Sequence, residues 1–167
     1  MSMLPTARWG LSALTTIGTM TLFGGLDSSG YLSDTWQMTS GCSGVATLTG
    51  SRGVFSDGDG PYRNSLDCKW TISPSLPNSN VLLVLTQLEL LDDGDKLEIY
   101  DGSSTSAPLL ASYTGTSIPP SVTSTGRHMV VWLRTDAAGA VGDGFQAAYQ
   151  AVCNAGYTWD TVRRYPA

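Results

Sequence analysis

The sequence has little positive charge and no long hydrophobic run. Its 167 residues carry nine lysines and arginines against fourteen aspartates and glutamates, for a formal net charge of -5. An acidic surface of this kind is a poor match for nucleic acid or anionic lipid. The densest apolar run, residues 81–85, is far shorter than the roughly 18 residues of a membrane-spanning helix. We therefore expect no nucleic-acid partner and no transmembrane segment.

The sequence also lacks the groups on which most catalytic sites depend. Its one histidine, His128, precedes a predicted strand, and neither a G-x-S-x-G motif nor a zinc-type histidine cluster is present. Paired carboxylates such as Asp93 and Asp95 could serve glycoside hydrolysis, but nothing sets a second carboxylate at a defined distance across a cleft. We therefore predict that the protein is not an enzyme.

A secretory signal and an N-glycosylation sequon are missing as well. The opening residues, "MSMLPTARWG", lack a charged start followed by an apolar stretch. We interpret this as a signal already removed or a piece of a longer chain. The three cysteines, Cys42, Cys68 and Cys153, form an odd set, so at least one is free or pairs outside the chain. Counting alone leaves three reduced cysteines of a cytosolic protein as an alternative.

What the sequence does contain is typical of an all-β protein. It has 19 glycines, 8 prolines and Asp-Gly pairs that favour tight hairpin turns. The segments "SALTTIG", "TMTLFGG" and "LSDTWQMT" in residues 1–40 are of strand length and predict a three-stranded meander.

Alternating apolar and polar residues predict further strands in residues 41–152. In "DKLEIY", Leu97 and Ile99 fall on the face expected to be buried. In "MVVWLR", Val130 and Trp132 fall on the opposite face, which predicts a contact surface or a second covering layer there.

Residues 1–40 resemble a kelch repeat, one blade of a β-propeller. The resemblance depends on Arg8, Gly24, Gly25, Asp34 and Trp36, which occur in the order of that motif. A single blade cannot bury both of its faces alone. An ordinary three-stranded extension packed on the next domain therefore remains the alternative.

Residues 41–152 resemble a CUB domain. The resemblance depends on the order and spacing of Cys42, "GVFSDGDGPYRNSLDCKWTISP", "VLLVLTQLEL", "DKLEIYDG", "IPPSVTSTGRHMVVWLRTD" and "GFQAAY". It implies an antiparallel, jelly-roll-like β-sandwich of the extracellular or lumenal kind. It also implies a disulfide between Cys42 and Cys68, whereas Asp92 and Thr114 stand where a second pair of cysteines is expected.

The same resemblance implies a calcium ion at one end of the sandwich. By position, two acidic ligands fall on Asp95 and Asp136, whereas the first falls on Leu91, so Glu89 or Asp92 would have to replace it. Ca²⁺ takes six to eight oxygen ligands, which carboxylates and loop carbonyls supply. The alternative is that these aspartates only form a turn and the start of a strand.

Residues 153–167 resemble the opening of a small cysteine-rich module, and the order of segments is similar to that of attractin-like cell-surface proteins. Trp159, Arg163 and Tyr165 have the composition of an anchor for a protein partner, as does Trp132 on its strand. We therefore predict a non-catalytic extracellular module that binds protein, as part of a larger protein or assembly. A carbohydrate-binding β-sandwich and a purely structural subunit tethered by its termini are the alternatives.

Overall fold

The protein is an all-β sandwich of two sheets, as the sequence predicts. The computed structural model describes residues 7–16, 19–39, 41–42 and 44–153. One sheet has seven strands in the order β1 (Ser12–Thr16), β2 (Thr19–Asp27), β3 (Gly30–Thr39), β5 (Arg52–Ser56), β12 (Gly144–Cys153), β7 (Ser79–Glu89) and β10 (Val122–Thr123). The other has five, in the order β4 (Val45–Leu48), β6 (Asp67–Ile72), β11 (Met129–Arg134), β8 (Lys96–Tyr100) and β9 (Leu109–Tyr113). The described part of the chain forms no helix capable of crossing a membrane.

The core lies between the sheets and is built from strands whose side chains alternate inward and outward. From Ser79 to Thr86 in β7 the burial alternates residue by residue, as a half-buried strand requires, and the alternation is interrupted at Gln87, where the pairing with β12 shifts register. Four aromatic side chains form the centre of the core: Phe55, Trp70, Phe145 and Tyr149. The rings of Trp70 and Phe145 pack edge to face, with centroids 5.1 Å apart.

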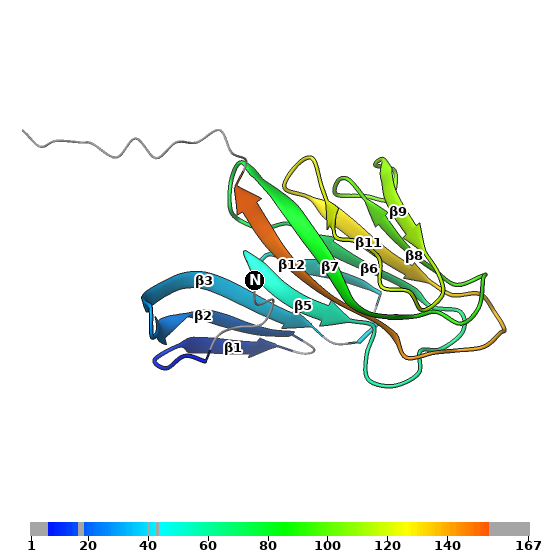
Figure 1. Cartoon of the computed structure of the whole chain (residues 1–167), viewed down its shortest axis with the longest axis horizontal. Helices are drawn as coiled ribbons and strands as arrows, with labels where there is room; N and C mark the ends of the chain where they lie inside the picture. Colours follow the sequence, from blue (N-terminus) through cyan, green and yellow to red (C-terminus); the bar gives the residue numbers. More distant parts are fainter. Residues whose placement is uncertain (1–6, 17–18, 40, 43, 154–167) are drawn as a thin grey trace, which may run out of the picture.

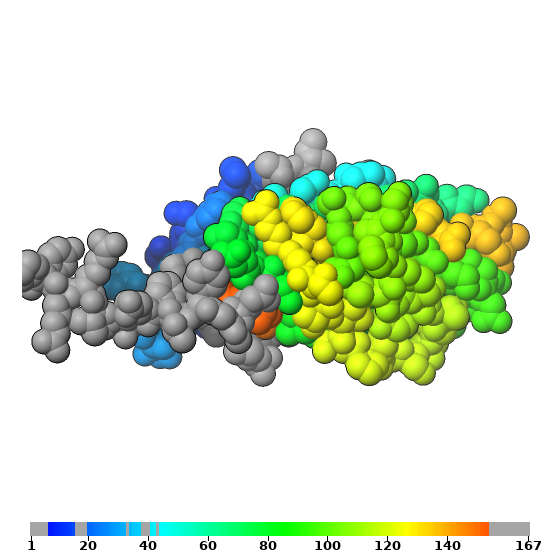
Figure 2. Space-filling view, turned by 90° about the horizontal axis from the view of Figure 1, so that it is seen from above, coloured from blue at the N-terminus to red at the C-terminus, as the bar shows by residue number. Residues whose placement is uncertain are grey.

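The first three strands form the expected meander and extend the larger sheet. β1 pairs with β2 and β2 with β3, both antiparallel, and β3 then pairs with β5 in parallel. The meander therefore reaches beyond the five-stranded sheet (Figure 1), and the space-filling view shows it to one side of the strands that form the visible face of the sandwich (Figure 2).

A polar network ties the meander together. The Arg8 guanidinium donates hydrogen bonds to Asp34 Oδ1 at 2.7 Å and to the Gly24 carbonyl at 3.0 Å. Asp34 Oδ2 accepts two more, from Trp36 Nε1 at 2.6 Å and from the other guanidinium nitrogen of Arg8 at 3.3 Å. Gly24 has a φ of +55°, and a Cβ at this position would lie 2.8 Å from the Leu32 carbonyl oxygen, so a glycine is required there. Four residues of the predicted motif thus meet in one place.

One expectation for the outer face of the five-stranded sheet is wrong. A contact surface on this face would expose Val130 beside Trp132, but only 2% of the Val130 surface is accessible. β11 is the central strand of this sheet, and Thr71 and Tyr100 flank Val130 in register. A short side chain between two such neighbours is shielded even on the outer face of a sheet.

Candidate functional site

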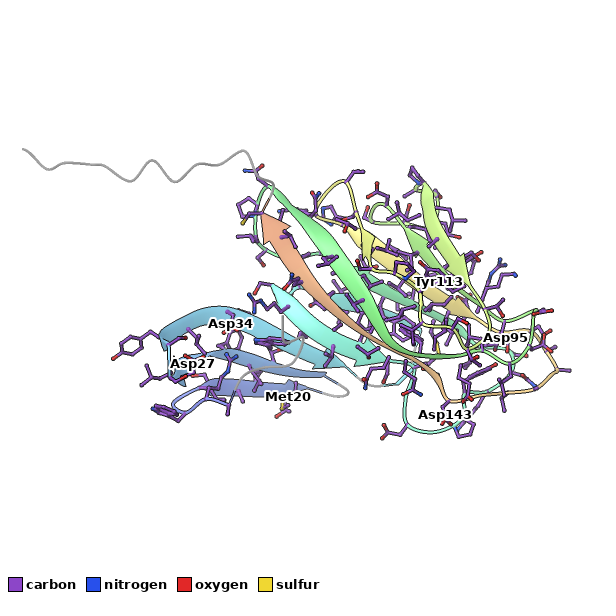
Figure 3. All side chains as sticks on the ribbon, in the orientation of Figure 1. Met20, Asp27, Asp34, Asp95, Tyr113 and Asp143 are labelled. Carbon is purple, nitrogen blue, oxygen red and sulfur yellow. A yellow bond between two sulfur atoms is a disulfide. The ribbon has the colours of Figure 1, made fainter. Side chains whose placement is uncertain are left out.

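The acidic end of the sandwich centres on Asp95, which immediately precedes β8. Its side chain is fully buried, and Figure 3 shows it at the end of the molecule remote from Asp34 and the meander. Asp95 Oδ2 accepts a hydrogen bond from the Tyr62 hydroxyl at 2.6 Å, and Oδ1 accepts one from the Asp136 backbone N–H at 2.9 Å. No lysine or arginine of the described residues forms a salt bridge with it. Asp95 is therefore a buried carboxylate satisfied by neutral donors.

Tyr62 joins three segments at this end. Its hydroxyl donates to Asp95 and accepts a hydrogen bond from the Leu91 backbone N–H at 3.3 Å, just after β7. Its own N–H donates to the Gly142 carbonyl oxygen at 3.0 Å. Burial and the hydrogen bond to Asp95 together raise the pKa of Tyr62 to about 12. The hydroxyl thus remains a donor throughout the neutral range.

Two more predicted acidic residues, Asp92 and Asp136, flank Gly94 in the β7–β8 turn. A Cβ on Gly94 would contact the carboxylate oxygens of both. Asp92 Oδ1 accepts a hydrogen bond from the Gly94 N–H at 2.7 Å, and Asp136 Oδ1 accepts one from the Ala138 N–H at 3.0 Å. Both side chains therefore belong to the same loop cluster as Asp95, and each already caps a backbone donor.

Glu89 serves a different part of this end. Its Oε2 accepts a hydrogen bond from the Asp143 N–H at 2.7 Å, and the side chain packs against Gly142. Leu91, which occupies the position implied for the first acidic ligand, is 49% exposed. The Glu89 carboxylate thus supports the loop before β12.

The donor set suits a hard cation, but the side chains do not converge on one. Carboxylate oxygens are the ligands that Ca²⁺ prefers, and a buried carboxylate without a basic partner favours a nearby cation. Among the residues that the structure describes, however, no group of three histidine, cysteine, aspartate or glutamate side chains is placed to hold a metal ion. Asp92, Asp95 and Asp136 would have to turn toward a common point to do so.

The disulfide implied by the family resemblance is present. Cys42 is bonded to Cys68, with Cα atoms 5.5 Å apart, and it ties the segment before β4 to β6. At the positions of the missing second pair, the Thr114 hydroxyl donates a hydrogen bond to the Asp92 carbonyl oxygen at 3.1 Å. The two positions are therefore neighbours in space. Cys153 is free and exposed.

No sequence pattern points to one further buried carboxylate, Asp57. It is only 8% exposed, and its Oδ1 accepts a hydrogen bond from the Phe145 N–H at 2.7 Å, while its other oxygen lies against Gly144. Burial, with a smaller contribution from the negative charge of Asp143, raises the pKa of Asp57. Its Asp-Gly pair indicates only a turn, because the partner lies 88 residues further along the chain.

Trp132 lies on the outer face of the five-stranded sheet, within a cluster of charges. Its indole N–H donates to Asp67 Oδ1 at 2.7 Å, and Lys69 Nζ lies 4.5 Å from the ring centroid. The Arg134 guanidinium lies 5.1 Å from the centroid and forms an ion pair with Glu98 at 3.0 Å. The half-buried ring is thus already in contact with two cations. The other predicted partner-binding residues, Trp159, Arg163 and Tyr165, lie outside the described residues.

Comparison with known proteins gives a consistent result. The family model described as "CUB domain" matches residues 42–149. Exoskeleton protein RP43 of Riftia pachyptila is 33% identical over 60% of this chain and 25% of its own length. Cubilin of Canis lupus familiaris is 36% identical over 70% of this chain and 3% of its own length. The chain thus spans a quarter or less of the length of each of these two relatives.

Solved structures share the fold. The MASP-1 CUB2 domain bound to Ca²⁺ superposes with a TM-score of 0.55 at 23% identity, over 66% of this chain and 100% of that domain. The extracellular region of zebrafish Gpr126/Adgrg6 gives a TM-score of 0.56 at 25% identity, over 68% of this chain and 15% of that one.

Proposed function

The chain belongs to the CUB domain family, and from this premise we propose that it is an extracellular or lumenal module that binds another protein through its acidic end, with Ca²⁺ ordering the loops. The observation that carries the proposal is Asp95, a fully buried carboxylate whose described partners are the Tyr62 hydroxyl and a backbone N–H. The disulfide supports an oxidising compartment, because such bonds do not persist in the cytosol.

The ion would draw on the loop cluster around Gly94. Asp95 and Asp136 are the proposed ligands, with Asp92 as the third carboxylate and Glu89 as the alternative. Asp92 already flanks Gly94 opposite Asp136, whereas Glu89 is engaged at the loop before β12. We therefore favour Asp92. An ion there would neutralise the negative charges and hold the 92–95 turn against the loop that follows β11.

A thermal melt with EDTA and with millimolar Ca²⁺ tests this proposal. A ligand that binds only the folded state must stabilise it, so we expect a higher Tm with Ca²⁺. The rise should disappear in the Asp95→Asn, Asp136→Asn variant and persist in Asp59→Asn, which removes an exposed charge nearby. An equal rise in all three proteins would contradict the proposed ligands, and no rise in any would contradict Ca²⁺ binding.

Protein is the favoured ligand class over carbohydrate. A carbohydrate-binding module needs free aromatic faces, and on the outer face of the five-stranded sheet the Trp132 ring does not offer one, because it is in contact with Lys69 and Arg134 and its N–H is bound to Asp67. Polysaccharide binding that survives loss of Asp95 would instead support the carbohydrate alternative. A purely structural subunit predicts neither Ca²⁺ stabilisation nor a soluble ligand.

We also propose that residues 1–40 are a kelch-like segment attached to the sandwich. The contacts of Arg8 and Trp36 with Asp34, and the backbone required at Gly24, support this assignment. The segment boundaries proposed from the sequence are 1–40, 41–152 and 153–167.

A further inference from the structure

The meander creates an apolar groove where it reaches beyond the five-stranded sheet. One wall is the inner face of β1, β2 and β3, and the other consists of loops that follow β4 and β6, enclosing about 570 Å³. No charged side chain is among the lining residues, which include Leu14, Thr21, Phe23, Ser51 and Leu76. The groove therefore offers an apolar surface that the second sheet leaves uncovered.

The large side chains of the groove are substantially exposed. Leu14 is 58% exposed, Phe23 45% and Leu76 36%. Strand register explains why two of them share a wall, because Leu14 lies opposite Thr21 and Phe23 lies two residues further along β2. Leu76 faces them from the β6–β7 loop.

The chain leaves the described region at the rim of this groove. The N–H of Ala151, near the end of β12, donates to the Ser51 carbonyl oxygen at 2.7 Å, and Ser51 lines the groove. Cys153, the last described residue, pairs with Ser79, whose hydroxyl donates to the Leu76 carbonyl oxygen at 2.8 Å. Cys153 therefore lies beside the wall that the two loops form.

The composition and length of the following segment fit the groove. Residues 154–159, "NAGYTW", carry no charge and contain two aromatic residues, and the first charge follows at Asp160. Six extended residues span roughly 20 Å. The four strand spacings from β12 to β1 amount to about 19 Å at ~4.8 Å each. Trp159 can therefore reach the far wall.

We propose that residues 154–159 fold back into this groove of the same chain, with the Trp159 ring between Leu14 and Leu76. The ring would cover apolar surface that is otherwise in water, and the short tether gives it a high effective concentration. The segment would strap the meander to the sandwich independently of the β3–β5 pairing. This inference goes beyond the proposed function, since it requires neither Ca²⁺ nor a partner.

Fluorine NMR of the full chain labelled with fluorotryptophan tests the strap. The protein contains five tryptophans, and the Trp159 signal is the one lost in Trp159→Phe. We expect Leu14→Glu to move this signal to the chemical shift that it has when the protein is unfolded in urea, because a charge in the groove expels the ring. Leu11→Glu is the matched control: Leu11 is also exposed, precedes β1 and does not line the groove. It should leave the signal unchanged.

The other tryptophan signals report whether each variant is folded. If Leu14→Glu disturbs the signal of Trp36, the meander itself has been altered by the change. Leu76→Glu then tests the groove from its opposite wall, which belongs to the sandwich. A Trp159 signal that is insensitive to both changes, or that already lies at its urea position in the unaltered chain, overturns the proposal. A signal that moves on dilution overturns it too, because the groove would then be filled by a second copy.

Discussion

At the scale of single residues, the acidic end is organised by hydrogen bonds to buried carboxylates. Asp95 and Asp57 are almost completely buried, and backbone N–H groups of Asp136 and Phe145 donate to them. Within the described part of the chain, Asp95 has a side-chain donor as well, the Tyr62 hydroxyl, whereas Asp57 has none. Such buried carboxylates are costly when a donor is lost, because water cannot replace it.

Replacing Tyr62 by phenylalanine removes that donor. We expect Tyr62→Phe to lower the free energy of unfolding by about 1.5–3 kcal/mol, the usual worth of a hydrogen bond to a charged group, measured by urea denaturation at pH 7. The raised pKa of Tyr62 contributes stability below pH 10 that is lost as the pH rises toward about 12, so the difference between the proteins should shrink over that window. Tyr31→Phe, at a 94% exposed position, should have no effect.

The burial of Asp57 predicts that the stability of the protein depends on pH in the acidic range. Because burial raises its pKa, this carboxyl group contributes stability at low pH that is lost as the pH rises through its folded pKa. Asparagine keeps an acceptor for the Phe145 N–H without the charge. We therefore expect the urea midpoint of Asp57→Asn, relative to the unaltered protein, to increase between pH 3 and pH 7. An equal increase in the exposed control Asp59→Asn would contradict this assignment.

At the scale of elements, a side-chain hydrogen bond stands where the family resemblance implies a second disulfide. Thr114 follows β9 and bonds to the Asp92 carbonyl oxygen in the turn after β7, next to the backbone bridge between Leu90 and Gly115. This polar contact holds the same two segments without a covalent bond.

Restoring a covalent link should stabilise this end. Asp92→Cys with Thr114→Cys would close a loop of 22 residues, worth about 3 kcal/mol in the chain-entropy model. We expect a higher Tm in the oxidised double variant than in Asp92→Ser with Thr114→Ser. Equal Tm values for an oxidised, verified disulfide would show that the folded geometry is strained by the bond.

The sequence predicts elements better than it predicts their partners. Alternation and Asp-Gly turns locate Leu97 and Ile99 in the core correctly, since these signals are local. Val130 could not be predicted in the same way, because its burial depends on the strands on either side of β11. The roles of Glu89 and Asp57 could not be predicted either. Their backbone hydrogen-bond donors lie 54 and 88 residues further along the chain, respectively, and no local pattern reports such contacts.

At the scale of the whole molecule, the meander is held by its own polar network as well as by β5. Burial alone would raise the pKa of Asp34, but hydrogen bonds from Arg8 and Trp36 and the charge of Arg8 outweigh it and lower that pKa. The carboxylate therefore contributes stability above its unfolded pKa that is lost as the pH falls through its folded one.

Removing this charge should loosen the meander selectively. Asp34→Asn weakens the contacts with Arg8 and Trp36, so we expect amides of β2 and β3 to exchange hydrogen at least about tenfold faster at neutral pH. Amides of β7 and β12 should exchange at unchanged rates. Faster exchange throughout both sheets would show instead that meander and sandwich open as one unit.

The position of β12 has a consequence for biosynthesis. It is the last of the described strands in the sequence, yet it lies between β5 and β7 near the middle of the larger sheet. Until residues 144–153 leave the ribosome, β5 and β7 of the nascent polypeptide each have an unpaired edge, with which another polypeptide could pair. Pairing of β5 and β7 into one sheet must therefore await translation of β12.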